Sequence, residues 1–182
     1  MSLVCPARRQ LILGISGVAV ASMFTTPAQA SRSTFGNKEL SFFNRHTGER
    51  QQGSYWSDGE YRQDTLELFS IVLRDHRQNE AAPMDNRLFE LLHNLQQTLG
   101  NSDEIHVISG YRSPKTNNML ATKSNGVAKK SYHMKGMAMD IAIPGIELKT
   151  LREAAISLKL GGVGYYPRSG FIHVDSGPVR SW

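Results

Sequence analysis

Cysteine is almost absent from this chain of 182 residues, and the single one, Cys5, lies near the amino terminus. Disulfide bonds are therefore excluded in the rest of the chain, whose fold must rest on packing and, where side chains allow it, on metal. Cys5 also precedes the apolar segment near the start of the chain, an order that argues against a lipid-modified cysteine at a processed amino terminus.

Long apolar runs are missing as well. The most apolar segment, residues 11–24, is shorter than the roughly 20 residues of a membrane-spanning helix, so we expect no membrane span in the mature protein. This segment follows Arg8 and Arg9 and precedes an Ala-x-Ala motif ending at Ala30, the order of an export signal. We predict that residues 1–30 are a signal peptide cleaved after Ala30 and that the mature protein is periplasmic. The paired arginines resemble the twin-arginine signature, and the choice between the twin-arginine (Tat) and the general secretory (Sec) route stays open.

Neither sign of charge dominates the mature chain. Without residues 1–30 there remain 19 basic and 16 acidic residues, and the two signs are mixed along the sequence. No basic strip is interleaved with aromatic residues, which excludes a typical nucleic-acid-binding protein. The small basic excess would suit an anionic polymer such as a cell wall.

Repeats of fixed period, low-complexity segments and Pro- or Ser-rich linkers are also missing from residues 31–182. The length of this segment is normal for one domain with a core of its own. We therefore predict a single domain spanning residues 31–182.

The hydrophobic pattern of residues 31–182 predicts an α+β domain with a mainly antiparallel sheet and helices packed on it. Strands are expected at residues 40–43, 54–56, 104–108, 137–143, 163–166 and 171–175. Helices are expected at residues 61–76, 85–100, 114–120 and 148–160, the last stopped by Gly161 and Gly162. Residues 122–130 are polar and are expected to form a loop.

Two histidines and one aspartate carry the chemistry that the sequence indicates most strongly. His133 and Asp140 are separated by six residues around Gly136, and His173 lies in the last predicted strand. Neighbouring strands can bring the three together, and Gly136 would permit a tight approach between the first two. Two imidazoles and one carboxylate leave a fourth zinc position open for water, as in hydrolytic sites.

Two alternatives to zinc stay open from the residues alone. His133 and His173 could be hydrogen-bonded structural histidines, or the same three ligands could hold non-haem iron. We prefer zinc to iron because iron oxygenases usually need a cosubstrate site, of which the sequence gives no sign.

Asp175 and Arg112 are the candidate catalytic residues. Asp175 follows His173 by two positions and should share its face of the sheet, which makes it the best candidate for the general base. Its alternative role is to orient a ligand imidazole. Arg112 follows a predicted strand and could clamp a substrate carboxylate or polarise a carbonyl, the alternative being a surface salt bridge.

The remaining histidines are expected to be structural or solvated. They are His46 in a turn, His76 and His93 on helices, and His106 in the strand that leads into the site.

Three blocks of sequence resemble the M15 group of zinc peptidases, and in particular its murein endopeptidases, over nearly all of residues 31–182. They are Ser109-Gly110-Tyr111-Arg112-Ser113, the stretch from Gly126 through His133 and Gly136 to Asp140, and the stretch from Gly161 through Arg168 to His173. The resemblance implies the fold of D-Ala-D-Ala peptidases and the Hedgehog signalling domain, with an antiparallel sheet that carries the metal. It implies one zinc ion per chain, bound by His133, Asp140 and His173, and makes Arg112 the arginine that polarises the substrate.

The chain departs from the M15 pattern at the catalytic base. Some members carry a catalytic Glu three residues before the last zinc ligand, where this chain has Gly170, and others carry a His two residues before it, where this chain has Phe171. The base role of Asp175 therefore rests on strand geometry alone.

The resemblance implies a zinc endopeptidase that hydrolyses peptide cross-links between peptidoglycan stem peptides and so opens the wall for growth. The most similar members suggest the 3-3 link between two meso-diaminopimelate residues, with the 4-3 link between D-Ala and meso-diaminopimelate as the second choice. One alternative is a zinc D,D- or L,D-carboxypeptidase that trims stem peptides. Another is a non-catalytic peptidoglycan-binding module. The oligomeric state is not indicated.

Overall fold

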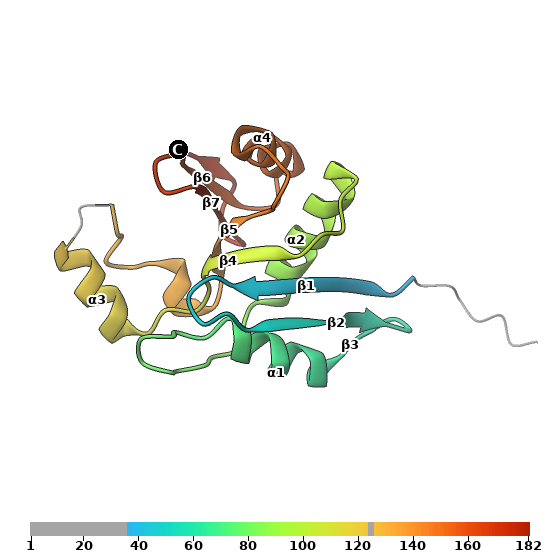
Figure 1. Ribbon diagram of the computed structural model, residues 1–182, viewed down its shortest axis with the longest axis horizontal. Helices are drawn as coiled ribbons and strands as arrows, with labels where there is room; N and C mark the ends of the chain where they lie inside the picture. The colour runs from blue at the N-terminus through green and yellow to red at the C-terminus, as the bar shows by residue number, and fades with distance from the viewer. Residues whose placement is uncertain (1–35, 124–125) are drawn as a thin grey trace, which may run out of the picture. The chain divides into compact units, whose positions relative to one another are not determined.

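Eight strands form one sheet in the computed structural model, which describes residues 36–123 and 126–182 (Figure 1). The strands, in their spatial order, are β3 (Glu60–Tyr61), β2 (Arg50–Ser57), β1 (Lys38–Asn44), β4 (Ile105–Ser109), β5 (Ala138–Ala142), β7 (Phe171–Asp175), β6 (Gly162–Tyr166) and β8 (Arg180–Ser181). The helices are α1 (Gln63–Val72), α2 (Asn86–Leu99), α3 (Pro114–Lys123), α4 (Leu148–Leu158) and the short 3-10 helix η1 (Tyr132–Lys135). The predicted signal peptide, residues 1–30, lies outside the described residues.

The sheet is mixed but mainly antiparallel. β1 pairs with β4 in parallel, as β6 does with β8, and the other five neighbouring pairs are antiparallel. The predicted single α+β domain is therefore confirmed. None of the helices in the described ranges combines the length and the apolar character needed to cross a membrane.

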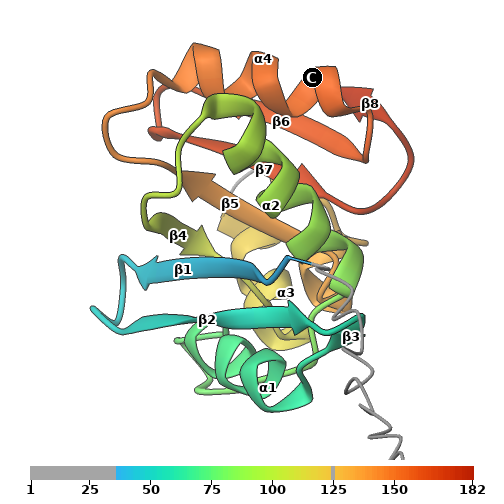
Figure 2. The same cartoon turned by 90° about the vertical axis from the view of Figure 1, so that its right-hand side faces the viewer.

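Alternation along the strands gives the sheet two different faces. In β5, Met139 and Ile141 join the hydrophobic core, whereas Asp140 between them points to the other face. In β7, Ile172 and Val174 join the hydrophobic core, and His173 between them points to the other face. Helices α1, α2 and α4 cover the apolar face, and α3 lies behind the sheet in this view (Figure 2). Polar side chains of the central strands are thus left on the face that the three helices do not cover.

Helix α2 follows its local signals closely. The Asp85 side chain accepts a hydrogen bond from the backbone N–H of Arg87 and caps the start of the helix, and Gly100 ends it in the left-handed conformation. Leucines at helical spacing predict an apolar stripe along this helix, and while Leu99 is partly buried, four of them are buried: Leu88, Leu91, Leu92 and Leu95.

The helix predicted at residues 61–76 is shorter at both ends. Tyr61 belongs to β3, where it pairs with Trp56, and α1 ends at Val72. The chain then turns, and the buried Asp75 carboxylate accepts two hydrogen bonds from Ser113. One comes from the Ser113 backbone N at 3.0 Å and the other from the Ser113 Oγ at 2.6 Å. His76 consequently lies in a loop, and its ring stacks on that of His46, with a centroid distance of 4.3 Å.

One further expectation about an element end is wrong, and one strand has no counterpart among the predicted elements. The helix predicted at residues 148–160 ends at Leu158, with Lys159 in the left-handed conformation, so that Gly161 and Gly162 are not its stop. Strand β8 was not expected at all. It has two residues, too few for a hydrophobic pattern to indicate.

Candidate metal centre

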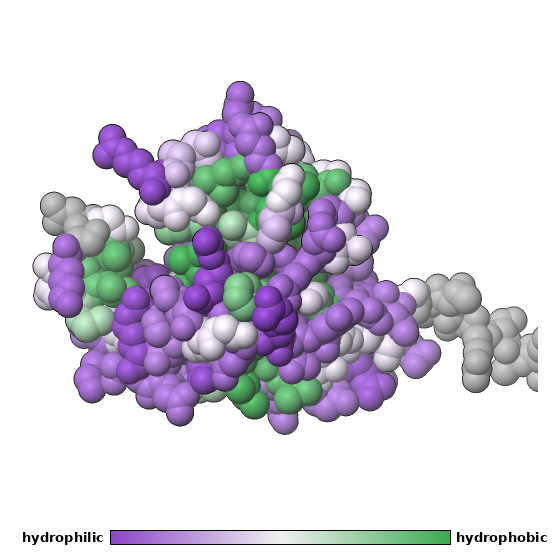
Figure 3. Space-filling model, viewed as in Figure 1, coloured by the Kyte–Doolittle hydropathy of each residue, from purple (hydrophilic) through white to green (hydrophobic). Residues whose placement is uncertain are grey.

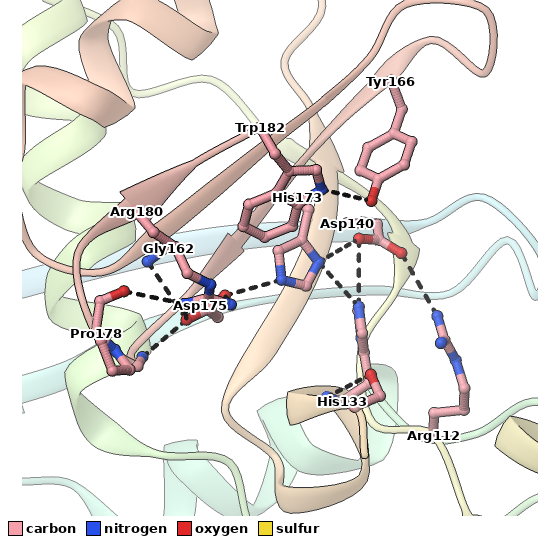
Figure 4. Close-up of polar contacts among 12 residues, drawn as sticks. Arg112, His133, Asp140, Gly162, Tyr166, His173, Asp175, Pro178, Arg180 and Trp182 are labelled. Carbon is pink, nitrogen blue, oxygen red and sulfur yellow. Dashed lines mark hydrogen bonds and ion pairs between the residues drawn. The ribbon is translucent and has the colours of Figure 1, made fainter. Parts of the chain in front are cut away.

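Asp140 and His173 face each other on neighbouring strands. β5 and β7 pair with these two residues directly opposite one another, on the face of the sheet that lacks the helices α1, α2 and α4. His133 comes from η1, just before the chain enters β5. The structure thus brings the three predicted ligands together: one nitrogen or oxygen of each lies within 4.8 Å of the others, and all three side chains are buried (Figure 4).

The spacing of the three atoms suits a small metal ion. Asp140 Oδ1 lies 2.9 Å from His173 Nδ1 and 3.3 Å from His133 Nε2, and the two ring nitrogens are 3.2 Å apart. Ligands at about 2.0–2.1 Å from a tetrahedral zinc ion lie about 3.3 Å from each other. The three residues are therefore close to the positions that zinc requires.

Each histidine ring has an inner nitrogen that faces the centre and an outer nitrogen that faces away from it. The hydrogen bond of the outer nitrogen determines whether the inner one carries a proton or a lone pair. His133 Nδ1 lies 2.8 Å from the carbonyl oxygen of Gly110, which can only accept, so this nitrogen carries the proton. His173 Nε2 lies 3.1 Å from Asp175 Oδ2 and donates in the same way. In the neutral rings both inner nitrogens then present lone pairs, next to the carboxylate of Asp140. Three electron-pair donors converging on one point need a cation between them.

Local charges favour a cation at the same point. Burial raises the pKa of Asp140, but His133 and His173 outweigh burial and hold this pKa well below its usual range. Burial lowers the pKa of His173, but its hydrogen bonds to Asp140 and Asp175 outweigh burial and raise that pKa. A proton and a metal ion would therefore compete for the His173 nitrogen that faces the centre.

Asp175 lies on the far side of His173 from the other two ligands. It is fully buried, and Oδ2 accepts from His173 Nε2 and, at 2.7 Å, from Arg180 Nη2. Oδ1 accepts from the backbone N–H of Gly177 at 2.9 Å and from Arg180 Nη1 at 3.1 Å. Asp175 shares the face of His173, as expected, but a general base must reach the proton that it removes. The geometry therefore does not support Asp175 as the base and favours its alternative role, orienting a ligand imidazole.

Arg112 is a buried residue beside the metal centre. Its Nη2 lies 3.6 Å from Asp140 Oδ2 and 3.2 Å from Ser109 Oγ, and its Nη1 lies 3.4 Å from Asn117 Oδ1. Only 9% of Arg112 is exposed, which does not fit the alternative of a surface salt bridge. Its guanidinium lines the pocket that leads to the centre and can meet a carbonyl or carboxylate oxygen there.

The pocket over the three residues has a volume of about 440 Å³, within the usual range for small-ligand sites. It lies between the segment that follows α3 and the β6–β7 hairpin, where the space-filling view is hollowed (Figure 3). Its basic lining residues are Arg112, Lys130 and Arg180, and its aromatic ones include Tyr166, Phe171 and Trp182. Such a lining can accept an anionic peptide.

Gly136 has a different role from the expected one. It ends η1 in the left-handed conformation, and a Cβ atom there would meet the carbonyl oxygen of Pro83, which is not part of the centre. The glycine thus serves the turn and its packing, and it does not act as a spacer between the ligands. His106 also lies outside the group of three ligands, and its ring packs against Phe43.

Sequence reasoning missed Arg180 and Trp182. Both follow the last predicted strand, and they reach the site because β8 pairs with β6. A signal existed in Gly162 and Gly164, because glycine inside a strand often marks the close approach of another group. A Cβ atom at Gly162 would meet the Arg180 side chain, and one at Gly164 would meet the Trp182 ring.

Known proteins resemble this chain over nearly its whole length. A family model, Peptidase_M15_2, described as peptidoglycan L,D-endopeptidase MepK, matches residues 32–182. The peptidoglycan L,D-endopeptidase MepK of Escherichia coli (strain K12) is 46% identical over 177 residues, which cover 97% of each chain. The probable peptidoglycan L,D-endopeptidase MepK of Haemophilus influenzae is 44% identical over 172 residues, which cover 93% of this chain and 92% of the relative.

Proposed function

This chain belongs to the peptidoglycan L,D-endopeptidase MepK family of M15 peptidases, and we propose that it is a zinc-dependent endopeptidase of peptidoglycan cross-links. It is a peptidase, and its bacterial relatives are named for action on peptidoglycan. The observation that carries the proposal is the convergence of His133 Nε2, His173 Nδ1 and Asp140 Oδ1 on one point at the base of a pocket.

The roles of the residues follow from their positions. His133, Asp140 and His173 would hold one zinc ion, which supplies Lewis acidity and a water molecule of lowered pKa. Asp175 keeps the His173 ring in the tautomer and orientation that binding needs. Arg112, on the pocket wall beside Asp140, donates hydrogen bonds to the carbonyl oxygen of the bond to be cut.

The 3-3 cross-link is the proposed substrate. In this link the carboxyl of the L-centre of one meso-diaminopimelate joins the amine of the D-centre of the next, an L,D bond, whereas the 4-3 link is a D,D bond. The names of the relatives support the L,D bond. The free carboxylates that flank it would meet the basic residues of the pocket: Arg112, Lys130 and Arg180.

A carboxypeptidase is the second candidate function. It would require a pocket that reads a free terminal carboxylate, and Arg112 is the residue that could do so. The relatives are named endopeptidases, which favours the first candidate. A non-catalytic binding module has no support in a chain that belongs to a peptidase family.

We also propose that residues 31–182 form the mature periplasmic enzyme. The family match begins at residue 32, just after the predicted cleavage at Ala30. A peptidoglycan substrate requires export across the inner membrane, which agrees with the signal pattern of residues 1–30.

The test is digestion of purified murein sacculi by residues 31–182, with the muropeptides identified by mass spectrometry. Loss of 3-3 cross-linked dimers with a matching gain of monomers is the expected result. Shortened monomers with intact dimers would identify a carboxypeptidase instead. Unchanged muropeptides in the presence of zinc would overturn the proposed function.

A further inference from the structure

Tyr166 ends β6 on the same face of the sheet as the metal centre. Gly164 pairs directly with His173, and side chains two positions apart share a face, so Tyr166 follows Gly164 on that side. Its neighbour Tyr165 packs against the hydrophobic core, whereas Tyr166 lines the pocket. The chain therefore presents one of two consecutive tyrosines to the site.

Trp182 fixes the hydroxyl group of Tyr166. The backbone of Trp182 continues the pairing along β6, donating to Val163 O at 3.2 Å and accepting from Tyr165 N at 3.0 Å. The indole ring then covers Gly164 and contacts the His173 ring at a centroid distance of 5.4 Å. Its Nε1 donates to Tyr166 Oη at 2.9 Å.

The hydrogen bond with Trp182 leaves the Tyr166 proton for another acceptor. An indole N–H can only donate, so the phenolic oxygen accepts and its own O–H points elsewhere. In the described ranges, 36–123 and 126–182, the structure shows no acceptor for it. Accepting one hydrogen bond also polarises the O–H and makes it a stronger donor.

Tyr166 and Arg112 lie on either side of the Asp140 carboxylate (Figure 4). Both residues line the same pocket, Tyr166 from the end of β6 and Arg112 from the segment after β4. A carbonyl group bound over the centre would lie between two hydrogen-bond donors. Donors that are held in place before charge develops on an oxygen provide much of the catalysis of acyl transfer.

We propose that Tyr166 is a catalytic residue and that Trp182 is its positioning residue. The Tyr166 hydroxyl donates a hydrogen bond to the oxygen of the scissile carbonyl as that oxygen gains negative charge, and Trp182 Nε1 holds the hydroxyl in place. The inference rests on the proposed peptidase activity at the same site. The Tyr166 hydroxyl would stabilise the transition state. This chain has Gly170 and Phe171 at the two positions where other M15 members carry a catalytic Glu or His.

The first experiment compares Tyr166→Phe with Tyr165→Phe as the matched control, in residues 31–182 acting on a purified cross-linked dimer. For Tyr166→Phe we expect kcat to fall by about 100-fold, with KM and zinc content unchanged. A phosphinate analogue of the scissile bond should bind less tightly to this variant, whereas the product peptide should bind as it does to the wild type. Tyr165→Phe should behave as the wild type in all five measurements.

A second measurement reports on the hydrogen bond between Trp182 and Tyr166 without turnover. In a Trp56→Phe background Trp182 is the single tryptophan, since the chain has two. Adding Tyr166→Phe removes the acceptor of its Nε1 and should shift its fluorescence emission, in the metal-free and the zinc-loaded protein alike. Trp182→Phe should lower kcat by less than Tyr166→Phe, because the hydroxyl remains.

The outcomes separate the inference from the function on which it rests. If the wild type cleaves the dimer but Tyr166→Phe matches Tyr165→Phe, the role of Tyr166 is disproved while the peptidase remains. An effect on KM alone, or a loss of zinc together with activity, would also overturn the catalytic role. If Tyr166→Phe shifts the Trp182 emission in the Trp56→Phe background as expected, but the wild type cuts no cross-link, the proposed function is overturned instead.

Discussion

Asp175 and Arg180 hold the His173 imidazole in place. The carboxylate binds His173 Nε2 on one side and the Arg180 guanidinium on the other, so the charge of the buried Asp175 is compensated. Burial raises the pKa of Asp175, but His173 and Arg180 outweigh burial and hold it well below the usual range. An ionised carboxylate on the outer nitrogen of a ligand imidazole increases its basicity and fixes its orientation.

Asp175→Asn distinguishes an orienting residue from a base. The variant should lower zinc affinity by about 10- to 100-fold, and excess zinc should restore much of the activity. Zinc affinity is measured by competition with a chromophoric chelator, with the exposed Asp64→Asn as the control. Unchanged zinc affinity with activity that zinc cannot restore would make Asp175 the general base after all.

His133→Ala tests the ligand set itself. The variant should retain its fold but bind less than a tenth of the zinc of the wild type, because a two-ligand site of the remaining residues is incomplete. Metal analysis of the purified protein gives the zinc content, and His93→Ala on α2 serves as the control. Full zinc content in His133→Ala would remove this residue from the site.

The convergence of His133, Asp140 and His173 could be expected from the sequence because their types and order are distinctive, whereas the orientation of each ring could not. Which nitrogen of His173 faces Asp140 depends on the position of Asp175, which Arg180 fixes from five residues further on. A side-chain rotation of this kind has no periodic signal. The sequence therefore left both roles of Asp175 open.

At the scale of elements, Asp75 ties the end of α1 to the start of α3. Its carboxylate accepts from the backbone and the hydroxyl of Ser113, the residue between Arg112 and the helix. Burial raises the pKa of Asp75, but these hydrogen bonds outweigh burial and lower it. The ionised carboxylate thus stabilises the segment that carries Arg112.

Asp75→Asn should lower the free energy of unfolding at pH 7 by about 1–3 kcal/mol, since a charged acceptor is lost from a buried hydrogen-bonded pair. Because the pKa is lower in the folded state, this stabilisation is present above about pH 4 and is lost as pH falls further. Urea unfolding of both proteins at pH 7 and pH 3.5 measures the difference, which should shrink at the lower pH. A difference that does not depend on pH would show that the charge of Asp75 contributes nothing.

Gly136→Ala and Gly145→Ala separate backbone strain from steric contact. Both glycines have positive φ, 66° and 77°, but only at Gly136 would a Cβ atom meet other atoms, those of Pro83 and Met84. Gly145→Ala should cost about 1 kcal/mol and Gly136→Ala at least twice as much, as measured by urea unfolding. Equal costs would mean that the packing of η1 on Pro83 is loose.

Elements with local signals were predicted well, and elements that depend on distant partners were not. Helix α2 carries its start, its apolar stripe and its end within its own sequence, from Asp85 to Gly100. α1 ends at Val72, before the predicted end at residue 76, and Asp75 beyond it binds Ser113, 38 residues further along the chain. β8 exists because Arg180 and Ser181 pair with Gly162 and Val163, which a pattern of two residues cannot reveal.

At the scale of the whole domain, the sheet has one face for stability and the other for chemistry. Three helices bury the apolar face, and the central strands β5, β7 and β6 present Asp140, His173 and Tyr166 on the other. Asp140 on β5 and His173 on β7 lie near the middle of the sheet, where strand pairing fixes their positions, and this rigidity suits a metal site.

The dependence of cleavage on zinc tests the central proposal most directly. Metal-free residues 31–182, prepared with a chelator, are titrated with zinc while hydrolysis of a purified 3-3 cross-linked dimer is followed by mass spectrometry. The expected result is no cleavage without metal, a rise in proportion to bound zinc and a plateau at one ion per chain, with no cleavage by His133→Ala at any point of the titration. Full cleavage by the metal-free protein would contradict a zinc peptidase built on His133, Asp140 and His173.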